Sequence, residues 1–297
     1  MRILLAYCCV ILLWATTPLA IKWSAEGAGF VFGAASRMFI GFICVFIILL
    51  FSRKPLPFHP KARQTYLAVA LQIYAAMLAV YWASRLIPSG WISVIFGLTP
   101  FMTALLSAFF LQEKSLGLGK ILSYLLGLGG LAVMFNSAIE FSDQAIQGMA
   151  GVLTAAFLHS ASAVWVKQIH ARLPALIQVG GGLLFAMPLY FLSWYLLEDG
   201  RLPATISWQA LAAIIYLGVV ATTLGFALYY YVLTHLPATN VALITIISPV
   251  LALYLGHSIN HEVLTLKVII GTSMIIAALF IHQFFDRFQK RQPCKSG

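Results

Sequence analysis

The sequence predicts an all-α integral membrane protein with ten transmembrane helices, arranged as two inverted five-helix repeats. Three observations lead to this prediction: the composition is too apolar for a water-facing surface, the apolar residues form runs of membrane-spanning length, and the second half of the chain repeats the first. Of the 297 residues, 62% are hydrophobic and 9% are charged, whereas a soluble domain carries about 25% charged residues. Most of the chain is therefore expected to face lipid rather than water.

The apolar runs are separated by short stretches of charged and turn residues, such as SRKPLPFHPKAR at 52–63 and EDGRLP at 198–203. An α-helix needs about 20 residues to cross the hydrocarbon core of a bilayer. By that measure the predicted spans are 3–21, 28–51, 65–84, 90–111, 118–138, 148–166, 174–197, 207–233, 238–257 and 263–284. The first run is longer than the ~7–15-residue core of a signal peptide, so we expect it to be retained as a membrane helix.

Lysine and arginine are distributed unequally between alternate connections. In the predicted topology, 13 of them lie on the side of the amino terminus and 4 on the opposite side, and Arg37 is inside a span. Since cytoplasmic loops carry the excess of basic residues, we expect both termini to face the cytoplasm, including the basic tail 287–297.

The composition also argues against several classes of function. The net charge of +10 would suit nucleic acid, but the basic residues lie in gaps between apolar runs and form no stripe with interleaved aromatic residues, so we expect no nucleic-acid partner. The four cysteines lack the spacing of metal ligands. We therefore expect neither a metal nor a cofactor.

A phrase of the sequence occurs twice, 149 positions apart. TPFMTALLSAFFLQE runs from Thr99 to Glu113, and SPVLALYLGHSINHE runs from Ser248 to Glu262. Further pairs at the same shift are Tyr81 with Tyr230 and Pro88 with Pro237. One repeat thus covers five spans, and because five is odd, the second copy must enter the membrane from the opposite side. The predicted repeats are 1–140 and 147–286. Inverted repeats are typical of transporters, which bind substrate near the bilayer midplane between them.

Two prolines fall near the middle of predicted spans four and nine, at matching positions of the repeat: Pro100 and Pro249. A proline inside a helix removes a hydrogen bond and crowds the carbonyl four residues before it, here that of Phe96 or Thr245. In hydrocarbon that carbonyl needs another partner. The hydroxyl residues able to supply one are Thr99 and Ser248. We interpret the pair as hinges beside a central cavity, with a kink that only shapes packing as the alternative.

Arg37 lies about ten residues into the second predicted span, where a charge costs at least ~2.5–3.5 kcal/mol. All eight acidic residues fall in connections or at span ends, so Arg37 has no evident carboxylate partner. Two interpretations remain open. Arg37 bonds helix-end carbonyls or extends toward an interface, or it faces a cavity and holds an anionic group such as an amino-acid carboxylate.

A looser match at a shift of 145 sets Lys22 against Lys167 at the ends of the first and sixth predicted spans. His159 lies midway along the sixth span, and at this shift Trp14 occupies the matching position of the first. His159 is a satisfied core residue, a polar group lining a cavity, or a proton relay. Trp14 is too deep for an interfacial belt, so it belongs to the core or to a cavity wall. Proton- and sodium-driven carriers often rely on embedded carboxylates, and their absence favours facilitated exchange.

Aromatic and acidic residues at the span ends complete the set of candidates. Tyr81 and Trp82, with Tyr230 at the matching position, end spans three and eight, where such rings anchor a helix at the interface or line a substrate site. Glu113 and Glu262 close the repeated phrase. Each either caps the following helix, where a carboxylate contributes ~0.3–1 kcal/mol, or latches a gate by an ion pair.

Three motifs carry a resemblance to a known family. These are LLWATTPLAIK at 12–22, SRMFIGF at 36–42 and the proline-to-LQE stretch at 100–113. In these motifs the sequence resembles the EamA family of the drug/metabolite transporter superfamily. The resemblance covers nearly the whole chain, as two EamA repeats of five spans each. It implies a ten-helix carrier of the inner (plasma) membrane, usually an exporter of small metabolites such as amino acids. Two positions depart from the family pattern. Ala15 stands where glycine is common, and the second copy of the phrase ends in HE, at Glu262, rather than in a GE-like pair.

The predicted function is therefore a secondary transporter that exports or exchanges small metabolites by alternating access. Its expected partners are the small-molecule substrate and the lipid bilayer, and a monomer is expected to suffice because both repeats lie in one chain. The alternatives are a polytopic membrane enzyme and a channel. The sequence has no HExxH or GxSxG motif and no filter-like loop or ring of charges, which favours a carrier over an enzyme or a pore.

Overall fold

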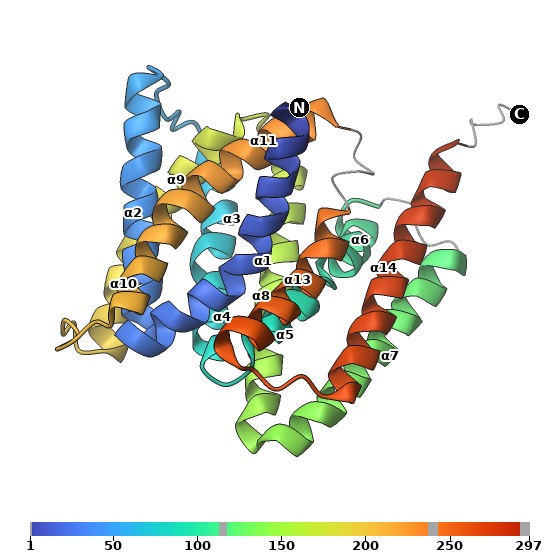
Figure 1. Ribbon diagram of the computed structural model, residues 1–297. Coiled ribbons are helices and arrows are strands. Elements are labelled where there is room, and N and C mark those ends of the chain that lie inside the picture. Colours follow the sequence, from blue (N-terminus) through green and yellow to red (C-terminus); the bar gives the residue numbers. More distant parts are fainter. Residues whose placement is uncertain (1, 113–117, 237–242, 292–297) are drawn as a thin grey trace, which may run out of the picture.

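The computed structural model describes residues 2–112, 118–236 and 243–291 (Figure 1). All regular elements in these residues are helices, and η1 and η2 are π-helical stretches within longer helices. The elements are α1 Arg2–Ala28, α2 Phe30–Phe51, α3 Pro60–Ala70, η1 Leu71–Ala76, α4 Met77–Ser84, α5 Ser89–Phe96, α6 Thr99–Phe110, α7 Leu118–Phe141, α8 Asp143–Ile169, α9 Ala175–Leu197, α10 Trp208–Ile215, η2 Tyr216–Leu224, α11 Gly225–His235, α13 Ile244–Asn260 and α14 Leu266–Arg291.

Each predicted span coincides with one helix or with one run of consecutive helices. In the described residues, eight helical stretches are long and apolar enough to cross a membrane, and two shorter apolar helices, Trp208–Leu224 and Ile244–Asn260, occupy the eighth and ninth predicted spans. Trp208–Leu224 continues directly into α11. The all-α fold is confirmed, whereas the number of membrane crossings stays a prediction.

Most of the helices form a closed ring. Along one side of the ring, α5 contacts α13, α13 contacts α1, α1 contacts α10 and α11, and η2 contacts α2. Along the other side, α2 contacts α9, α9 contacts α3, η1 contacts α8, and α8 contacts α6. The helices α7 and α14 pack against each other beside this ring (Figure 1).

The order of neighbours in the ring is unchanged when the two halves of the chain are exchanged. In that exchange α1 takes the place of α8, α2 that of α9, α3–α4 that of α10–α11, and α5–α6 that of α13. The contact between α1 and α13, for example, becomes the contact between α8 and α6, and both are observed. The two halves therefore contribute equivalent sets of helices to one ring.

Glycines allow the closest helix contacts. A Cβ atom on Gly181 of α9 would lie 2.1 Å from Cδ1 of Tyr66 in α3, and the neighbouring Gly180 faces α2 in the same way. In α7 and α14, a Cβ on Gly130 would lie 2.6 Å from the carbonyl oxygen of Gly271, and a Cβ on Gly271 would lie 2.7 Å from that of Gly130. Small residues at such contacts are how membrane helices approach closely.

The fourth predicted span is broken in the middle. α5 ends at Phe96, Gly97 and Leu98 form a turn, and α6 begins at Thr99. Pro100 therefore occupies the first turn of α6, where its missing N–H costs no helical hydrogen bond. Thr99 Oγ1 donates to the carbonyl oxygen of Phe96 at 2.7 Å, which confirms the hydroxyl-to-carbonyl bond expected from the sequence.

The ninth predicted span behaves differently. α13 continues through Pro249 without a break. Ser248 Oγ is buried and has no hydrogen-bond partner among the described residues, so the rebonding expected of Ser248 is not observed. The matched prolines thus stand in two different backbone conformations, one in a broken helix and one in a continuous helix.

The third and eighth predicted spans each contain a π-helical stretch, η1 and η2. Side-chain hydroxyls bond to backbone carbonyls there: Tyr190 Oη donates to Ile73 O at 2.7 Å, and Thr222 Oγ1 donates to Leu217 O at 2.8 Å. Stretches of π-helix are rare and frequently mark functional sites. Both stretches take part in the contacts between neighbouring helices of the ring: η1 packs against α8 and α9, and η2 packs against α1 and α2.

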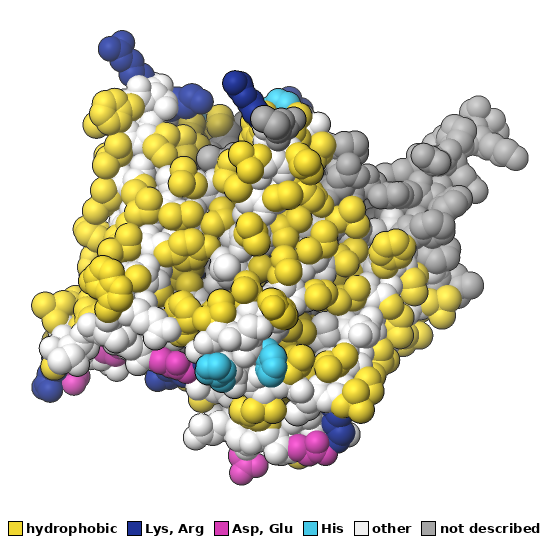
Figure 2. All heavy atoms as spheres, viewed as in Figure 1, with side chains coloured by type: hydrophobic (Ala, Val, Ile, Leu, Met, Phe, Trp, Pro, Cys, Tyr) yellow, Lys and Arg dark blue, Asp and Glu magenta, His cyan; other side chains and the backbone are white. Residues whose placement is uncertain are grey.

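The surface has the layering of a membrane protein. In the view of Figure 2, hydrophobic side chains cover a broad middle band, and charged side chains gather at the two ends. α1 begins and α14 ends at the same end of the molecule (Figure 1). We call this end the terminal face and the other end the opposite face.

The contact between α9 and α3 makes a direct prediction. Gly181→Val should destabilise the protein by about 1–3 kcal/mol, the usual cost of overpacking, because the added methyl groups would enter the space of the Tyr66 ring. Thermal unfolding of the purified protein in detergent measures the change. Gly129→Val is the matched control, because a Cβ there meets only the Met274 methyl, the flexible end of a side chain, at 3.1 Å. Equal unfolding midpoints for the two variants would contradict the assigned packing.

Candidate functional site

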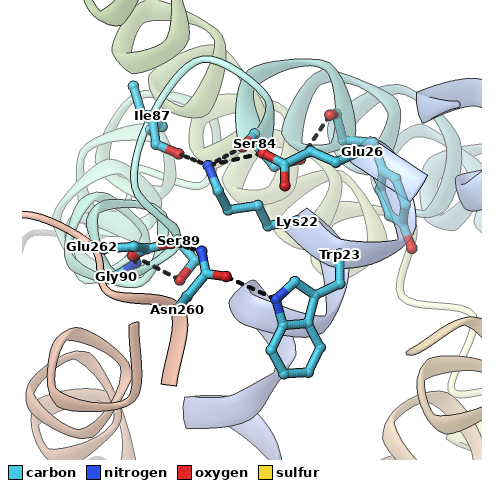
Figure 3. Close-up of polar contacts among 10 residues, drawn as sticks. Lys22, Trp23, Glu26, Ser84, Ile87, Ser89, Gly90, Asn260 and Glu262 are labelled. Atoms are coloured by element: carbon cyan, nitrogen blue, oxygen red, sulfur yellow. Dashed lines mark hydrogen bonds and ion pairs between the residues drawn. The ribbon is translucent and has the colours of Figure 1, made fainter. Parts of the chain in front are cut away.

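At the opposite face, Lys22 ties the end of α1 to the connection between α4 and α5 (Figure 3). Lys22 Nζ donates to the carbonyl oxygens of Ser84 at 3.2 Å and Ile87 at 3.0 Å. It also forms an ion pair with Glu26 Oε1 at 3.2 Å. Carbonyl groups at the end of a helix lack helical partners and carry partial negative charge, so they suit a cation.

Glu262 joins the end of α13 to the beginning of α5 (Figure 3). Its Oε2 accepts hydrogen bonds from Ser89 Oγ at 3.0 Å and from the backbone N–H of Gly90 at 3.4 Å. Its Oε1 accepts one from Asn260 Nδ2 at 3.0 Å, and Asn260 Oδ1 accepts one from Trp23 Nε1 at 3.0 Å. The expectation that Glu262 caps the helix that follows it is wrong. It caps α5, in the other half of the chain, because α13 and α5 are packed side by side.

The turn after α13 explains where this carboxylate points. His261 has φ of 53°, and the backbone N–H of Glu262 donates to Gly256 O at 3.1 Å, which is the pattern of a left-handed helix end. Gln112, 149 residues earlier, also has φ of 53°. The two copies of the repeated phrase therefore end in the same backbone conformation, although Glu113 itself lies outside the described residues.

The space enclosed by the ring of helices is blocked at the opposite face. There α1 also crosses the ring to contact α4 and α5, whereas the counterpart contacts of α8 with α11 and α13 are not extensive in the described part of the chain. Val152, His159 and Ala163 share one face of α8, by helical spacing. Val152 is fully buried and Ala163 is exposed. The inner face of α8 thus becomes accessible toward the terminal face.

Arg37 is buried, with 7% of its surface exposed. Its Nε donates to Thr222 Oγ1 at 3.4 Å, and Tyr190 and Tyr216 lie near its guanidinium group. We call these four residues the arginine layer. Nη1 of Arg37 has no hydrogen-bond partner among the described residues, and no hydrogen bond to a helix-end carbonyl is found there. The guanidinium group therefore retains a buried donor for an anionic group.

The adjacent aromatic residues Tyr81 and Trp82 point in different directions. Tyr81 is fully buried, its hydroxyl accepts from Ser24 Oγ at 3.4 Å, and its Cε1 would lie 3.4 Å from a Cβ on Gly33. Tyr81 thus faces α2 beside the arginine layer, and its burial argues against an interfacial anchor. The ring of Trp82 contacts α8 at Gly151.

Trp14 stacks on Tyr229, with ring centroids 5.2 Å apart and planes inclined by 29°. This contact joins α1 to α11, and Trp14 keeps 37% of its surface exposed. Near it, Thr16 Oγ1 and Tyr216 Oη are 2.6 Å apart, which connects α1 to the arginine layer. Tyr230 belongs to α11, and its side chain is outside the described part of the structure.

His159 of α8 lies beside the break in the fourth span. Its ring meets Phe96 edge-on, with centroids 5.9 Å apart, and its Nδ1 has no hydrogen-bond partner in the residues that the structure describes. The next residue, Ser160, donates from Oγ to Thr99 O at 3.3 Å. His159 is thus a polar group next to the point where α5 and α6 diverge.

The structure does not gather the predicted residues in one place. Tyr81 meets α2 at Gly33, one turn from Arg37, whereas Trp14, Trp82 and His159 contact other helices of the ring. The polar residues of the site that sequence reasoning did not select are Lys22, Asn260, Tyr190 and Thr222. For three of them the sequence holds no signal, because hydroxyl and amide residues in helices commonly bond their own backbone. Lys22 had one weak signal, its match to Lys167 at a shift of 145.

Comparison with known proteins points to one family. The EamA-like transporter family matches residues 1–136 and 146–282. The uncharacterized transporter YoaV of Bacillus subtilis is 25% identical over 285 residues, which cover 95% of this chain and 97% of YoaV. The probable amino-acid metabolite efflux pumps of Salmonella typhimurium and Escherichia coli are 27% and 26% identical, over 68% of this chain and 70% of each pump.

A solved crystal structure has the same fold, with a TM-score of 0.65 at 19% identity, and the match covers 96% of this chain and 98% of that one. The two family matches cover nearly the whole chain. They also fall on the two halves whose exchange leaves the helix ring unchanged. The protein belongs to the EamA-like transporter family.

Proposed function

We propose that the protein is a secondary transporter of the inner (plasma) membrane that exports or exchanges small metabolites, such as amino acids or related compounds, by alternating access. The observation that carries the proposal is a ring of helices, built from two interchangeable halves, that is closed at one face. Membership of a transporter family supports it, and two relatives are named as amino-acid metabolite efflux pumps.

We assign the two halves as inverted repeats of five membrane spans each. The unchanged order of the ring on exchange supports this assignment, as do the π-helical stretches in spans three and eight. The matching φ of 53° at Gln112 and His261 supports it further. A repeat with an odd number of spans must insert in the opposite orientation, which gives a pair of equivalent states that are open to opposite sides.

We assign the terminal face to the cytoplasm because the predicted connections on that side carry most of the basic residues. The structure then represents the state that is open to the cytoplasm, and the bonds of Lys22 and Glu262 form the closed external gate. In the second state, Lys167 and Glu113 take the corresponding places and close the cytoplasmic side.

The matched prolines supply the hinges in this mechanism. The turn at Gly97 and Leu98 lets α6 move while α5 stays anchored by Glu262. On the other side, Ser248 already has an unused hydroxyl next to Pro249. That hydroxyl can bond to a freed carbonyl when α13 bends, as Thr99 does in the broken span.

In this mechanism the predicted site residues lie at different depths along the passage through the ring. Trp14 and His159 lie at matching positions of α1 and α8 and form walls of the central passage, with the aromatic ring of Trp14 offering apolar area. Arg37 lies closer to the external gate, where its unpartnered Nη1 is suited to a substrate carboxylate.

Transport itself is tested in proteoliposomes. Purified protein screened against amino acids and related metabolites should show saturable counterflow of at least one labelled compound. Flux that rises linearly with concentration would indicate a channel instead, and chemical conversion of a compound would indicate a membrane enzyme.

The role of Arg37 is tested by a conservative substitution. Arg37→Lys should fold normally and raise the KM for a carboxylate-bearing substrate about tenfold, because lysine lacks the planar fork that binds a carboxylate with two parallel bonds. Arg201→Lys, in the exposed connection after α9, is the control and should leave KM unchanged. Flux that is unaffected by Arg37→Ala would remove Arg37 from the substrate site.

The external gate is tested by labelling a buried position behind it. Ser84→Cys, in a background without the native cysteines, should react slowly with a membrane-impermeant maleimide added outside, because residue 84 is fully buried. Adding Glu262→Ala should speed the reaction about tenfold, since a hydrogen bond to a charged group contributes ~1.5–3 kcal/mol. Adding Glu140→Ala should change little, because its ion pair with Lys267 joins α7 to α14 beside the ring. Labelling only from the cytoplasmic side would contradict the assigned orientation.

A further inference from the structure

A cavity of about 260 Å³ lies between η1, α8 and α9. Three of its lining residues are polar: Gln72 of η1, Ser162 of α8 and Gln178 of α9. The others are aliphatic, including Ala163 on the inner face of α8. The cavity lies within two turns of the end of α8 and within the first turns of α9, so it belongs to the half of the ring nearer the terminal face.

The polar residues of the cavity differ in how many of their hydrogen-bond donors and acceptors already have a partner. Ser162 Oγ donates to Ala68 O at 2.6 Å, and Gln178 Nε2 donates to Leu173 O at 2.7 Å. Gln178 therefore keeps its carbonyl oxygen for another partner. The carboxamide of Gln72 makes no hydrogen bond within the described residues, so both its donor and its acceptor remain available beside the cavity.

The lining also limits the charge of what can bind. None of the lining residues is charged, and a charged group placed there would lose its water without gaining an ion partner, which is costly. An uncharged polar group loses less, and it can exchange hydrogen bonds with the two carboxamides. The volume is below the about 300–1,000 Å³ of typical sites for drug-sized ligands, so it suits part of a small metabolite.

The counterpart of this cavity, between η2, α1 and α2, is packed. At the shift of 145 residues, Gln72 corresponds to Leu217 and Ala163 to Pro18. Leu217 is fully buried, and Pro18 is buried as well, whereas Ala163 is exposed. The cavity is therefore present on the open side of the ring, and its counterpart near the closed side is filled by side chains.

We propose that this cavity binds the uncharged polar end of the substrate, a carboxamide group, through Gln72 and the carbonyl oxygen of Gln178. The inference rests on the proposed transport function and narrows its substrates to metabolites with such an end group. Substrate binds here from the open side, and the π-helical turn of η1 presents Gln72 to it. When the ring closes at the terminal face in the second state, side chains fill the cavity as they fill its counterpart now, and the end group of the substrate is released.

Two probes that differ only in this end group test the inference: L-glutamine and L-glutamate. Equilibrium binding to the purified protein should favour L-glutamine at least about tenfold. Gln72→Leu should remove that preference by weakening L-glutamine alone, because leucine keeps the size of the side chain but offers no hydrogen bond. Ala163→Leu, which fills the cavity, should weaken L-glutamine binding as well.

The matched control is Ala161→Leu, on the side of α8 that carries the exposed Phe157 and Trp165, and it should leave binding unchanged. Equal or undetectable binding of the two probes to the wild type would overturn the inference, as would a preference that survives Gln72→Leu. Counterflow of some other metabolite with an unchanged KM in both cavity variants would overturn the inference and leave the transport function standing. Absence of counterflow for every compound would overturn the transport function, and the binding results would still decide the role of the cavity.

Discussion

The departures from regular α-helix in this ring depend on hydroxyl groups that bond to backbone carbonyls. Water does not reach the hydrocarbon core, so each carbonyl freed from a helix must find a partner within the protein, at a cost of several kcal/mol if it fails. Thr99 supplies that partner at the broken fourth span, Tyr190 at η1 and Thr222 at η2. Because of these bonds, the carbonyl oxygens of Phe96, Ile73 and Leu217 keep a hydrogen-bond partner where the helices of the ring depart from regular geometry.

The two halves of the chain contribute equivalent helices but not equivalent conformations. The fourth span is broken before Pro100, while α13 runs through Pro249. One face of the ring is held by the carboxylate of Glu262 on the first turn of α5 and by Lys22 on the end of α4. A protein made of two similar units has to differ between them in this way if its passage is to be open on one side at a time.

Sequence reasoning succeeded where the cause is local and failed where the partner comes from another helix. The apolar runs predicted the helices because lipid permits little else, and the bond from Thr99 to Phe96 was predicted because a proline disturbs a carbonyl at a known distance along the chain. Glu262 was correctly expected to cap a helix, but which helix it caps depends on the packing of α13 on α5. The cavity at Gln72 is formed by three helices that are remote in sequence, so no spacing in the chain indicates it.

The isolated charge of Arg37 has a consequence for the energetics of the proposed transport cycle. Its guanidinium group is buried within a membrane-spanning helix, and its side-chain hydrogen bond goes to a neutral threonine. A charge in that position experiences the electrical potential across the bilayer, which acts on it with up to about 2.3 kcal/mol per 100 mV if it crosses the full field. Under the proposed alternating-access mechanism, any rocking of α2 that shifts Arg37 along the membrane normal would make the balance between the two states depend on voltage, so that the membrane potential would help to decide which way the protein faces.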